Sequence, residues 1–335
     1  MINSKIVTFL CVLSFAIPTL SNEKKDNDVK EYTSNMIHFD QEEKIMLDKD
    51  NKPISGIAKN YYPSGKLKEE AVFKNGKQTD IAKDYYENGK IKKEKTYKNG
   101  NLDGKFNEYY EDGTIKTEAF FKKGIQTDIT KKYYENGKLK TEITYKKGEL
   151  EGPYKEYHMA GVLKSEGAFK KGKLEGEFKE YYQDGGIKKE KFYKNGELDG
   201  ILREYYEKGV LKTEAIFKAG KLNGLMTEYY ENGKIKIEKF YSLGEPEGKA
   251  KEYYENSTIK TAAVFEKGQL EGIVKEYYEN GNLEAEKNYK KGVLDGEYRE
   301  YYVDGTIKTE AVFKNGEVEG KIKEYDKYGD LVAER

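Results

Sequence analysis

The side chains of this sequence that could support acid–base or metal chemistry are few and isolated. The two histidines, His38 and His158, have no cysteine or second histidine at the spacing of metal ligands. His158 stands where most copies of a repeated Tyr-Tyr pair have their second tyrosine, so it reads as a variation within an aromatic series. The single cysteine, Cys11, lies in an apolar N-terminal run. The sequence therefore indicates neither a metal centre nor a thiol nucleophile.

Carboxylates are abundant, but none is set apart from the others by its surroundings. Asp and Glu together number 61, and they alternate with 61 Lys and Arg residues rather than forming blocks. The segment 48–56, DKDNKPISG, is weakly similar to a calcium-binding loop but lacks the glycine of the sixth position and the glutamate of the twelfth. Acid–base catalysis requires two groups whose pKa values are driven apart by distinct environments. We therefore expect a non-enzymatic protein without a cofactor.

The aromatic side chains differ from these groups because they recur with a fixed spacing. Tyrosines stand 24 residues apart from Tyr61 to Tyr325, and in most copies a second tyrosine follows directly. A tyrosine ring combines a large apolar surface with a polar hydroxyl group, which suits the recognition of proteins and glycans. The chemistry that the sequence favours is therefore non-covalent binding.

Glycines with the same period place turns between the aromatic residues. Glycine follows each of these tyrosines by four residues, with Ser257 as the exception, and a second series runs from Gly76 to Gly316. In a third series, Asp80 and Asp128 replace glycine. Asn-Gly between aromatic runs is typical of β-hairpins. Each 24-residue unit therefore predicts two strands and two turns, and the chain predicts an all-β fold, an elongated single-layer antiparallel β-meander of 24-residue hairpin repeats.

Charge pairs test the register of these hairpins. If Asn88-Gly89 is a two-residue loop, Tyr86 faces Ile91 and Lys83 faces Glu94. The same register pairs Lys131 with Glu142, Lys155 with Glu166, Lys179 with Glu190, Arg203 with Glu214, Lys275 with Glu286 and Arg299 with Glu310. Such pairs contribute about 0.2–1 kcal/mol each across antiparallel strands, whereas a slip of one residue would turn every side chain to the other face. The pairs therefore favour this register.

In this register the aromatic and branched side chains gather on one face of the sheet and the charges on the other. A single-layer sheet cannot bury an apolar face unaided, so the face must curl on itself, meet a second copy or meet a partner. It is either a structural ladder alone or a ladder that also binds. The residues expected to contact a partner are Tyr86, Tyr110, Tyr134, Tyr182, Tyr206, Tyr230, Tyr254, Tyr278, Ile91, Ile115, Ile187 and Ile235.

A period of 48 residues is superimposed on the period of 24. The aromatic residue before the second turn alternates from Phe73 and Tyr97 through to Phe313, with alanine two residues before most of the phenylalanines and lysine before most of the tyrosines. Duplication of a two-unit segment explains this alternation, and a functional two-unit motif is the alternative.

The repeat GKFNEYYEDGTIKTEAFFKKG, residues 104–124, resembles the MORN (membrane occupation and recognition nexus) repeat in its bacterial variant form. The shared elements are the aromatic pair, the turn glycine, the following Ile-Lys and the closing aromatic-Lys-x-Gly, and twelve copies cover residues 54–335. The resemblance implies a sheet of β-hairpins used for interaction or scaffolding, and some bacterial members are labelled antitoxins of the YwqK type. Others carry a kinase label, but this sequence has neither a kinase phosphate loop nor a catalytic loop.

The N-terminus has the order of a secretory signal peptide. In residues 1–21, Lys5 precedes an apolar run that ends in the small residues Thr19 and Ser21. We expect export to the periplasm, the cell surface or the medium, with a retained N-terminal anchor as the alternative. Residues 22–53 are expected to form a polar segment followed by a cap that shields the first sheet edge.

The balance of positive and negative charges argues against some classes of binding partner. The formal net charge is zero, which argues against nucleic acid, and no basic stripe suggests membrane contact beyond the N-terminal segment. We therefore expect an exported, non-enzymatic interaction or scaffold protein that binds a protein or glycan, or a second copy, through its aromatic face. The alternative is an antitoxin or immunity protein that neutralises a partner toxin, a role that fits a signal peptide poorly if the toxin acts in the cytoplasm.

Overall fold

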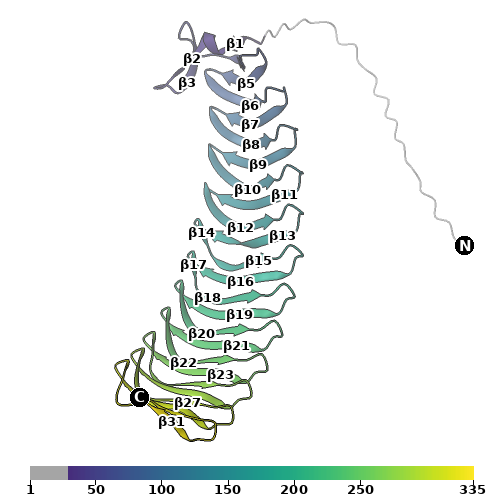
Figure 1. Ribbon diagram of the computed structural model, residues 1–335. Helices are drawn as coiled ribbons and strands as arrows, with labels where there is room; N and C mark the ends of the chain where they lie inside the picture. Colours follow the sequence, from purple (N-terminus) through teal and green to yellow (C-terminus); the bar gives the residue numbers. More distant parts are fainter. Residues whose placement is uncertain (1–28) are drawn as a thin grey trace, which may run out of the picture.

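A computed structural model describes residues 29–335, and within this range almost the whole chain lies in one open sheet (Figure 1). The sheet has 29 strands, which follow one another in chain order, and a separate hairpin forms a second sheet of two strands. From β4 onward, the pairings between consecutive strands of the large sheet are antiparallel, whereas β1 pairs with its neighbour β4 in parallel. The all-β fold, an elongated single-layer antiparallel β-meander, is therefore confirmed. The expected signal peptide, residues 1–21, lies outside the described residues.

The strands have the following bounds: β1 Glu31–Thr33, β2 Ile37–Asp40, β3 Ile45–Asp48, β4 Gly56–Tyr61, β5 Leu67–Lys74, β6 Lys77–Tyr85, β7 Ile91–Lys98, β8 Asn101–Tyr109, β9 Ile115–Lys122, β10 Ile125–Tyr133, β11 Leu139–Lys146, β12 Glu149–Tyr157, β13 Leu163–Lys170, β14 Lys173–Leu174, β15 Gly176–Tyr181, β16 Ile187–Lys194, β17 Glu197–Leu198, β18 Gly200–Tyr205, β19 Leu211–Lys218, β20 Lys221–Tyr229, β21 Ile235–Ser242, β22 Glu245–Tyr253, β23 Ile259–Glu266, β24 Gln269–Leu270, β25 Gly272–Tyr277, β26 Leu283–Lys290, β27 Val293–Tyr301, β28 Ile307–Lys314, β29 Glu317–Val318, β30 Lys323–Tyr325 and β31 Leu331–Glu334. One turn of 3-10 helix, η1, covers Ser34–Met36.

The first turn of each unit is wider than the sequence predicted. The amide of Tyr86 donates to the carbonyl of Lys90 at 2.8 Å, and the amide of Gly89 donates to the carbonyl of Tyr86 at 2.9 Å. The loop therefore has three residues and ends in a glycine at φ +84°, the arrangement of a turn followed by a left-handed residue. Ile91 consequently pairs with Tyr85, and the predicted pairing of Tyr86 with Ile91 is wrong.

The second turn follows the prediction. Asn99 and Gly100 both have positive φ, at 49° and 79°, as a two-residue type I′ turn requires, and Tyr97 pairs with Leu102.

Where aspartate replaces glycine in the third series, the backbone conformation changes as well. Asp80 has φ +58°, in the left-handed region that aspartate tolerates, whereas the equivalent Gly104 has φ +136°, which only glycine adopts readily.

Away from the turns, the strand register agrees with the charge pairs. All seven predicted charge pairs are cross-strand neighbours. In the six other than Lys83 and Glu94, the charged atoms lie between 2.7 Å, for Arg203 and Glu214, and 3.9 Å, for Lys179 and Glu190. A bulge beside each three-residue loop absorbs the one-residue difference between the predicted and the observed turn, so the error does not propagate along the strands.

The N-terminal residues of the described chain lie over the first edge of the sheet. Strand β1 runs parallel to β4, and the β2–β3 hairpin lies beside it. The amide of Met46 donates to the carbonyl of Gly76 at 2.8 Å, and Ile54 is fully buried. This cover prevents the edge of β4 from pairing with another chain along its first residues.

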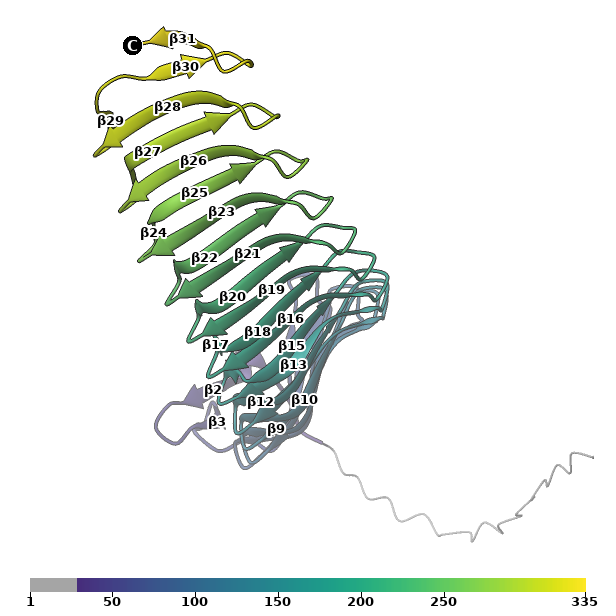
Figure 2. The same ribbon diagram turned by 90° about the horizontal axis from the view of Figure 1, so that it is seen from below.

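The strands bend into arcs, so that the sheet has two unlike faces (Figure 2). We call inner the face that carries the row Ala82, Lys95, Phe106 and Ala119, which are paired in this order across β6 to β9. We call outer the face that carries the row Lys83, Glu94, Asn107 and Glu118 on the same strands. Small residues of the inner face are nearly inaccessible, with Ala82 at 3 % and Ala215 at 2 % exposure.

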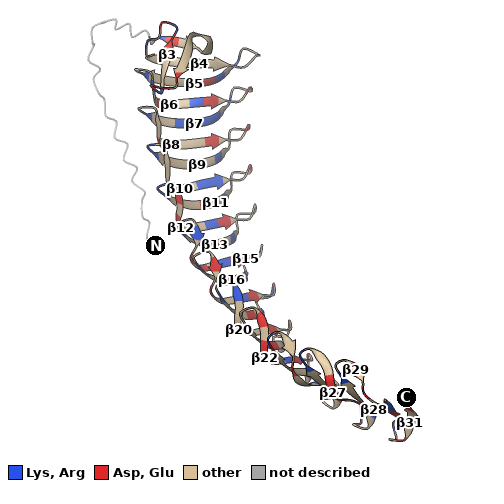
Figure 3. Ribbon diagram, turned by 90° about the vertical axis from the view of Figure 1, so that its left-hand side faces the viewer, with Lys and Arg blue, Asp and Glu red and all other residues tan. Residues whose placement is uncertain are grey.

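Charges of both signs are interspersed along the sheet (Figure 3). In the described part of the chain there is no helix of the length and apolar character needed to cross a bilayer.

Candidate binding surface

The second tyrosine of each pair ties its unit to the next one. The hydroxyl of Tyr86 donates a hydrogen bond of 2.7 Å to the main-chain carbonyl of Tyr109, and the same bond recurs in ten units at 2.5–2.9 Å. The donors are Tyr62, Tyr86, Tyr110, Tyr134, Tyr182, Tyr206, Tyr230, Tyr254, Tyr278 and Tyr302. We call this row, beside the three-residue loops, the tyrosine edge. Its hydroxyl groups are therefore engaged within the chain.

Lysine ammonium groups cover the rings of the tyrosine edge. Lys212 Nζ lies 5.8 Å from the ring centroid of Tyr206, and six further lysines stand over their tyrosines in the same way at 5.4–5.9 Å. A cation over an aromatic face contributes about 0.5–1 kcal/mol at an exposed site. The edge thus presents rings and positive charges together at regular intervals.

A groove lies beside the loop of the tyrosine edge that follows β18. It is flanked by the loops after β15 and β20 and has a volume of about 280 Å³. It is lined by Tyr182, Tyr206, Glu207, Lys208, Val210, Lys212 and Glu231. The rings of Tyr182 and Tyr206 are therefore reachable from solvent although their hydroxyl groups are bonded inside the chain.

The structure places the predicted contact residues in two positions. The eight predicted tyrosines are half-buried members of the tyrosine edge. The four isoleucines are also half-buried, but each pairs across the hairpin with the first tyrosine of the pair: Ile91 with Tyr85, Ile115 with Tyr109, Ile187 with Tyr181 and Ile235 with Tyr229. The tyrosines and isoleucines are thus brought to the same end of the strands, not into one cross-strand pair.

On the inner face, aromatic rings pack against one another. Phe106 and Phe121 meet edge to face at 6.0 Å, and Tyr154 contacts Phe169 at 5.7 Å and Phe178 at 6.5 Å. Such pairs contribute about 0.5–1.5 kcal/mol beyond the area they bury. This face therefore covers part of its own apolar surface, without a second layer.

The alternation with a period of 48 residues has a physical counterpart on this face. Phe121 is accompanied by the buried Ala119, whereas Tyr97 is accompanied by Lys95, whose ammonium group lies 2.8 Å from the carboxylate of Asp84. In a later unit, Lys239 Nζ lies 4.3 Å from the ring centroid of Phe265. Alternate units thus contribute a small apolar residue or a lysine that is paired with a carboxylate or a ring.

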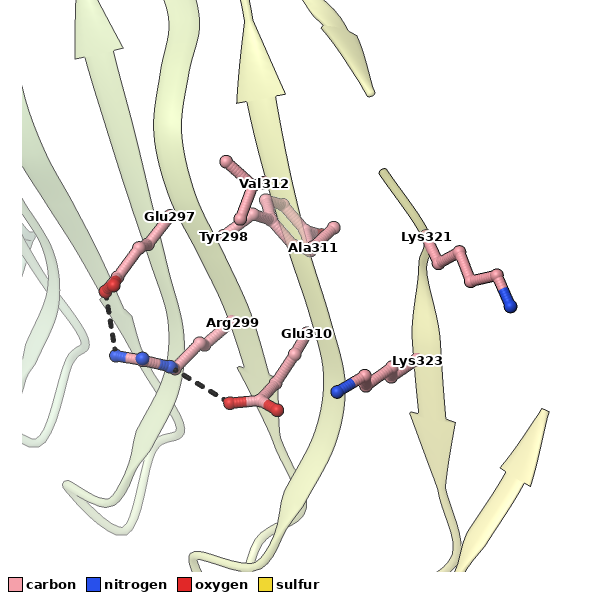
Figure 4. Close-up of a pocket in the computed structure, with 8 residues that line it drawn as sticks. All are labelled: Glu297, Tyr298, Arg299, Glu310, Ala311, Val312, Lys321 and Lys323. Carbon is pink, nitrogen blue, oxygen red and sulfur yellow. Dashed lines mark hydrogen bonds and ion pairs between the residues drawn. The ribbon is translucent and has the colours of Figure 1, made fainter. Parts of the chain in front are cut away.

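Two further hollows are open to solvent and are lined by both polar and apolar groups. One of about 350 Å³ lies on the inner face at the N-terminal end and is lined by residues that include Phe73, Ala82, Lys95 and Tyr97. The other, of about 190 Å³, lies between β28 and β30 (Figure 4). There Arg299 lies between Glu297, at 3.1 Å, and Glu310, at 3.3 Å, so its charge is compensated.

On the outer face, the first tyrosine of most units bonds to a carboxylate of the preceding unit. Tyr205 donates to Glu190 at 2.9 Å, and eight other tyrosines bond in the same way to the glutamate 15 residues earlier. The pKa values of Tyr181, Tyr205 and Tyr253 are raised to about 12. Burial is the larger cause, and the hydrogen bond to the carboxylate is the second. These tyrosines stay protonated donors at physiological pH.

The outer face also carries a row of apolar side chains that sequence reasoning missed. We call it the outer apolar row. Its exposed members are Ile81, Phe120, Ile129, Phe192, Ile201, Ile216, Phe240, Val264, Ile273 and Val312, each 36–51 % accessible. The predicted division into an apolar and a charged face is therefore incomplete. The sequence contains a signal for this row. Its members either directly precede the aromatic residue before the second turn or pair, on the neighbouring strand, with the residue at that preceding position.

The described residues contain no cluster of three or more His, Cys, Asp or Glu side chains that could hold a metal ion. His38 is exposed on β2. His158 occupies a tyrosine-edge position, and its Nε2 atom is buried without a hydrogen-bond partner in the described structure. The inter-unit bond is thus missing at this one place inside the tyrosine edge.

Comparison with known proteins agrees with this architecture. The family described as MORN repeat variant matches residues 54–75, 81–99, 102–123, 129–147, 174–195, 198–219, 222–242, 246–267, 270–291 and 294–315. These ten segments make up more than half of the chain, so the protein belongs to the MORN repeat variant family, whose repeats serve binding. The unmatched stretch between 147 and 174 contains His158.

Similarity to other proteins is weak. No curated protein matches the sequence. Solved structures described as TcdB2-TccC3-Cdc42, TcdB2-TccC3-TEV and the Photorhabdus luminescens Tc holotoxin pore each match 87 % of this chain at 10–12 % identity, with TM-scores of 0.16–0.17. The chain spans at most a fifth of the length of these solved chains. With so low a TM-score, the likeness carries no argument here.

Proposed function

We propose that the protein is an exported, non-enzymatic scaffold that captures a protein partner along its tyrosine edge. The observation that carries this proposal is a repeated geometry, a tyrosine ring fixed by its hydroxyl with a lysine above it, together with the groove beside Tyr206. Because neighbouring strands are about 4.8 Å apart, equivalent rings recur at roughly 10 Å intervals along the array. An extended segment of a partner could contact several of them at once.

Pre-organisation explains why such an edge suits binding. A tyrosine whose hydroxyl is already bonded loses little conformational freedom when a partner packs against its ring. The accompanying lysines and the glutamates of the loops supply charges of both signs at the rim of the groove. A partner with exposed apolar or aromatic side chains and interspersed charges fits this chemistry best.

Binding is tested by changing the groove without touching the tyrosine hydroxyls. The triple variant K208S/V210S/K212S removes groove-lining side chains beside Tyr206. Y206F, in contrast, removes the hydroxyl but keeps the ring. In pull-downs from the exported fraction of the native cells, the triple variant should lose the partner and Y206F should retain it. Retention by the triple variant would show that the tyrosine edge is only structural.

Export and the identity of the partner need separate measurements. The proposal of export is supported by the order of residues in 1–21, and fractionation followed by immunodetection should find the protein outside the cytoplasm. Capture of a toxin in the pull-down, together with rescue of growth on co-expression, would assign the narrower antitoxin role.

A further inference from the structure

The middle of the outer apolar row is nearly the same when read in either direction. The residues in line with it on seven neighbouring strands, β15, β16, β18, β19, β20, β21 and β22, are Glu177, Phe192, Ile201, Ile216, Leu225, Phe240 and Lys249, so that a charged residue stands at each end. The cross-strand pairs Glu177–Phe192, Ile201–Ile216 and Leu225–Phe240 place them on one face. Reversal of the order exchanges Phe192 with Phe240, Ile201 with Leu225, and Glu177 with Lys249, and leaves Ile216 in place.

We propose that two copies of this protein associate through this stretch of the outer face, with their arrays antiparallel and Ile216 at the two-fold axis. In such an isologous contact, each residue meets the residue at the mirrored position of the other copy. Phenylalanine then meets phenylalanine, and isoleucine meets leucine. Glu177 of each copy meets Lys249 of the other, so the contact closes with two ion pairs.

The exposure of these side chains supports the assignment. Phe192, Ile201, Ile216 and Phe240 are 36–49 % accessible, whereas the inner-face neighbour of Ile216, Ala215, is 2 % accessible. Large side chains thus project from the outer face, and nothing in the described chain covers them. Two sheets pack about 10 Å apart when such side chains interdigitate.

The charges at the two ends of the stretch select the antiparallel arrangement. Lys249 is exposed and has no carboxylate within ion-pair distance in the described structure. Glu177 is exposed and lies 3.1 Å from Lys179, an exchangeable surface pair. A parallel arrangement would place Glu177 on Glu177 and Lys249 on Lys249, which is unfavourable. Charge complementarity therefore favours a second copy of this chain in the antiparallel direction.

The area of the stretch approaches that of a standard stable contact. Seven strands at about 4.8 Å spacing and about six residues of length give a footprint of roughly 700 Å² per copy. A standard stable interface removes about 800 Å² per partner. The adjacent charged row, two residues away on the same strands, would bring like charges near one another, but Arg203 and Glu214 are paired within each copy at 2.7 Å, which compensates their charges.

This inference uses the outer face and is independent of the tyrosine edge, so the two proposals fail separately. The test is sedimentation equilibrium of the full exported chain and of charge-swap variants. The wild type should dimerise at micromolar concentration. E177K and K249E should each weaken dimerisation by about tenfold or more, because each places like charges together twice per dimer. The double variant E177K/K249E should restore it.

Matched controls separate the contact from folding. K105E and E297K reverse charges at the same position of the repeat but outside the seven strands, and they should dimerise as the wild type does. Circular dichroism should show the same β-structure for all variants. A monomeric wild type, single swaps without effect, or a double swap that does not restore the dimer would each overturn the proposal.

Discussion

The hydroxyl of Tyr206 donates a hydrogen bond of 2.9 Å to the main-chain carbonyl of Tyr229, one repeat further along the chain. This bond joins the loop of one hairpin to the start of the next loop, and it adds to the strand pairing and the Tyr–Glu bonds that also connect the units. Its recurrence makes the tyrosine edge a continuous seam. The same ring is open to a groove on its other side, so one residue type supports both the array and the proposed binding surface.

Removal of this hydroxyl should weaken the array locally. We expect Y206F to lower the free energy of unfolding by about 1 kcal/mol, because the carbonyl of Tyr229 loses its donor while the ring packing remains. Denaturant unfolding monitored by circular dichroism measures the change. Tyr328, which is 78 % exposed, provides the control. Y328F should leave the midpoint unchanged, and equal effects of the two substitutions would contradict the role of the bond.

A substitution that supplies the missing hydrogen bond at position 158 should stabilise the array. At His158 the Nε2 atom is buried without a partner, at a position where ten other units have a bonded tyrosine. H158Y should therefore raise the free energy of unfolding by about 1–2 kcal/mol, by relief of an unsatisfied polar atom and gain of a hydrogen bond to Tyr181. H158F, which adds the ring alone, should stabilise less. A loss of stability in H158Y would show that the local backbone has adapted to histidine.

Alkaline pH should unfold the array. Tyrosine in the unfolded chain ionises near pH 10, whereas Tyr181, Tyr205 and Tyr253 have folded-state pKa values of about 12. The unfolded state therefore loses protons first. The stability that these tyrosines contribute is fully present below pH 10 and is lost as the pH rises to about 12.

Unfolding curves measured across this range, with phenolate absorbance as a second signal, test this dependence. The variant Y181F/Y205F/Y253F should show a shallower loss of stability above pH 10. Stability of the wild type that does not change between pH 10 and 12 would be incompatible with these pKa values.

The glycines of the third series should not be interchangeable with alanine. A Cβ atom at Gly104 would lie 2.9 Å from the Cβ of Thr96, and the backbone is at φ +136°. G104A should therefore lower the free energy of unfolding by about 1–3 kcal/mol. At the equivalent Asp80 the backbone has φ +58°, which a non-glycine residue already occupies. D80A should cost clearly less, and equal costs would argue against the backbone explanation.

Repetition made the strands predictable, because the correct register of one hairpin also gives the register of the hairpins in the other units. The Lys–Glu pairs identified that register correctly, as the 2.8 Å contact of Lys275 with Glu286 illustrates. The three-residue loop at Gly89 was missed because Asn-Gly is compatible with both a two-residue turn and a wider one that adds a bulge. Only the hydrogen bond between Tyr86 and Lys90 distinguishes them.

The candidate surface was predicted by residue type but not by role. The sequence singles out the second tyrosines, yet it gives no indication that their hydroxyls are bonded to the next unit, because that contact joins residues 23 positions apart. The outer apolar row is hard to predict because the more highly charged units alternate between an apolar and a charged face. In units such as the one with Ile201 and Ile216, both faces carry apolar residues. Another contact between units is the hydrogen bond that the amide of Lys171 donates to the Glu151 carboxylate at 2.7 Å. It depends on turn geometry that the sequence does not reveal.

The central claim, that the tyrosine edge captures a protein partner, is tested most directly by site-specific photo-crosslinking. A photoreactive amino acid replaces either Val210, which lines the groove before β19, or Lys218, at the other end of the same strand. The protein is then irradiated in intact cells, and adducts are identified by mass spectrometry. We predict one protein partner joined at position 210 and absent at 218. Adducts at 218 alone, or the same adducts at both positions, would contradict the claim.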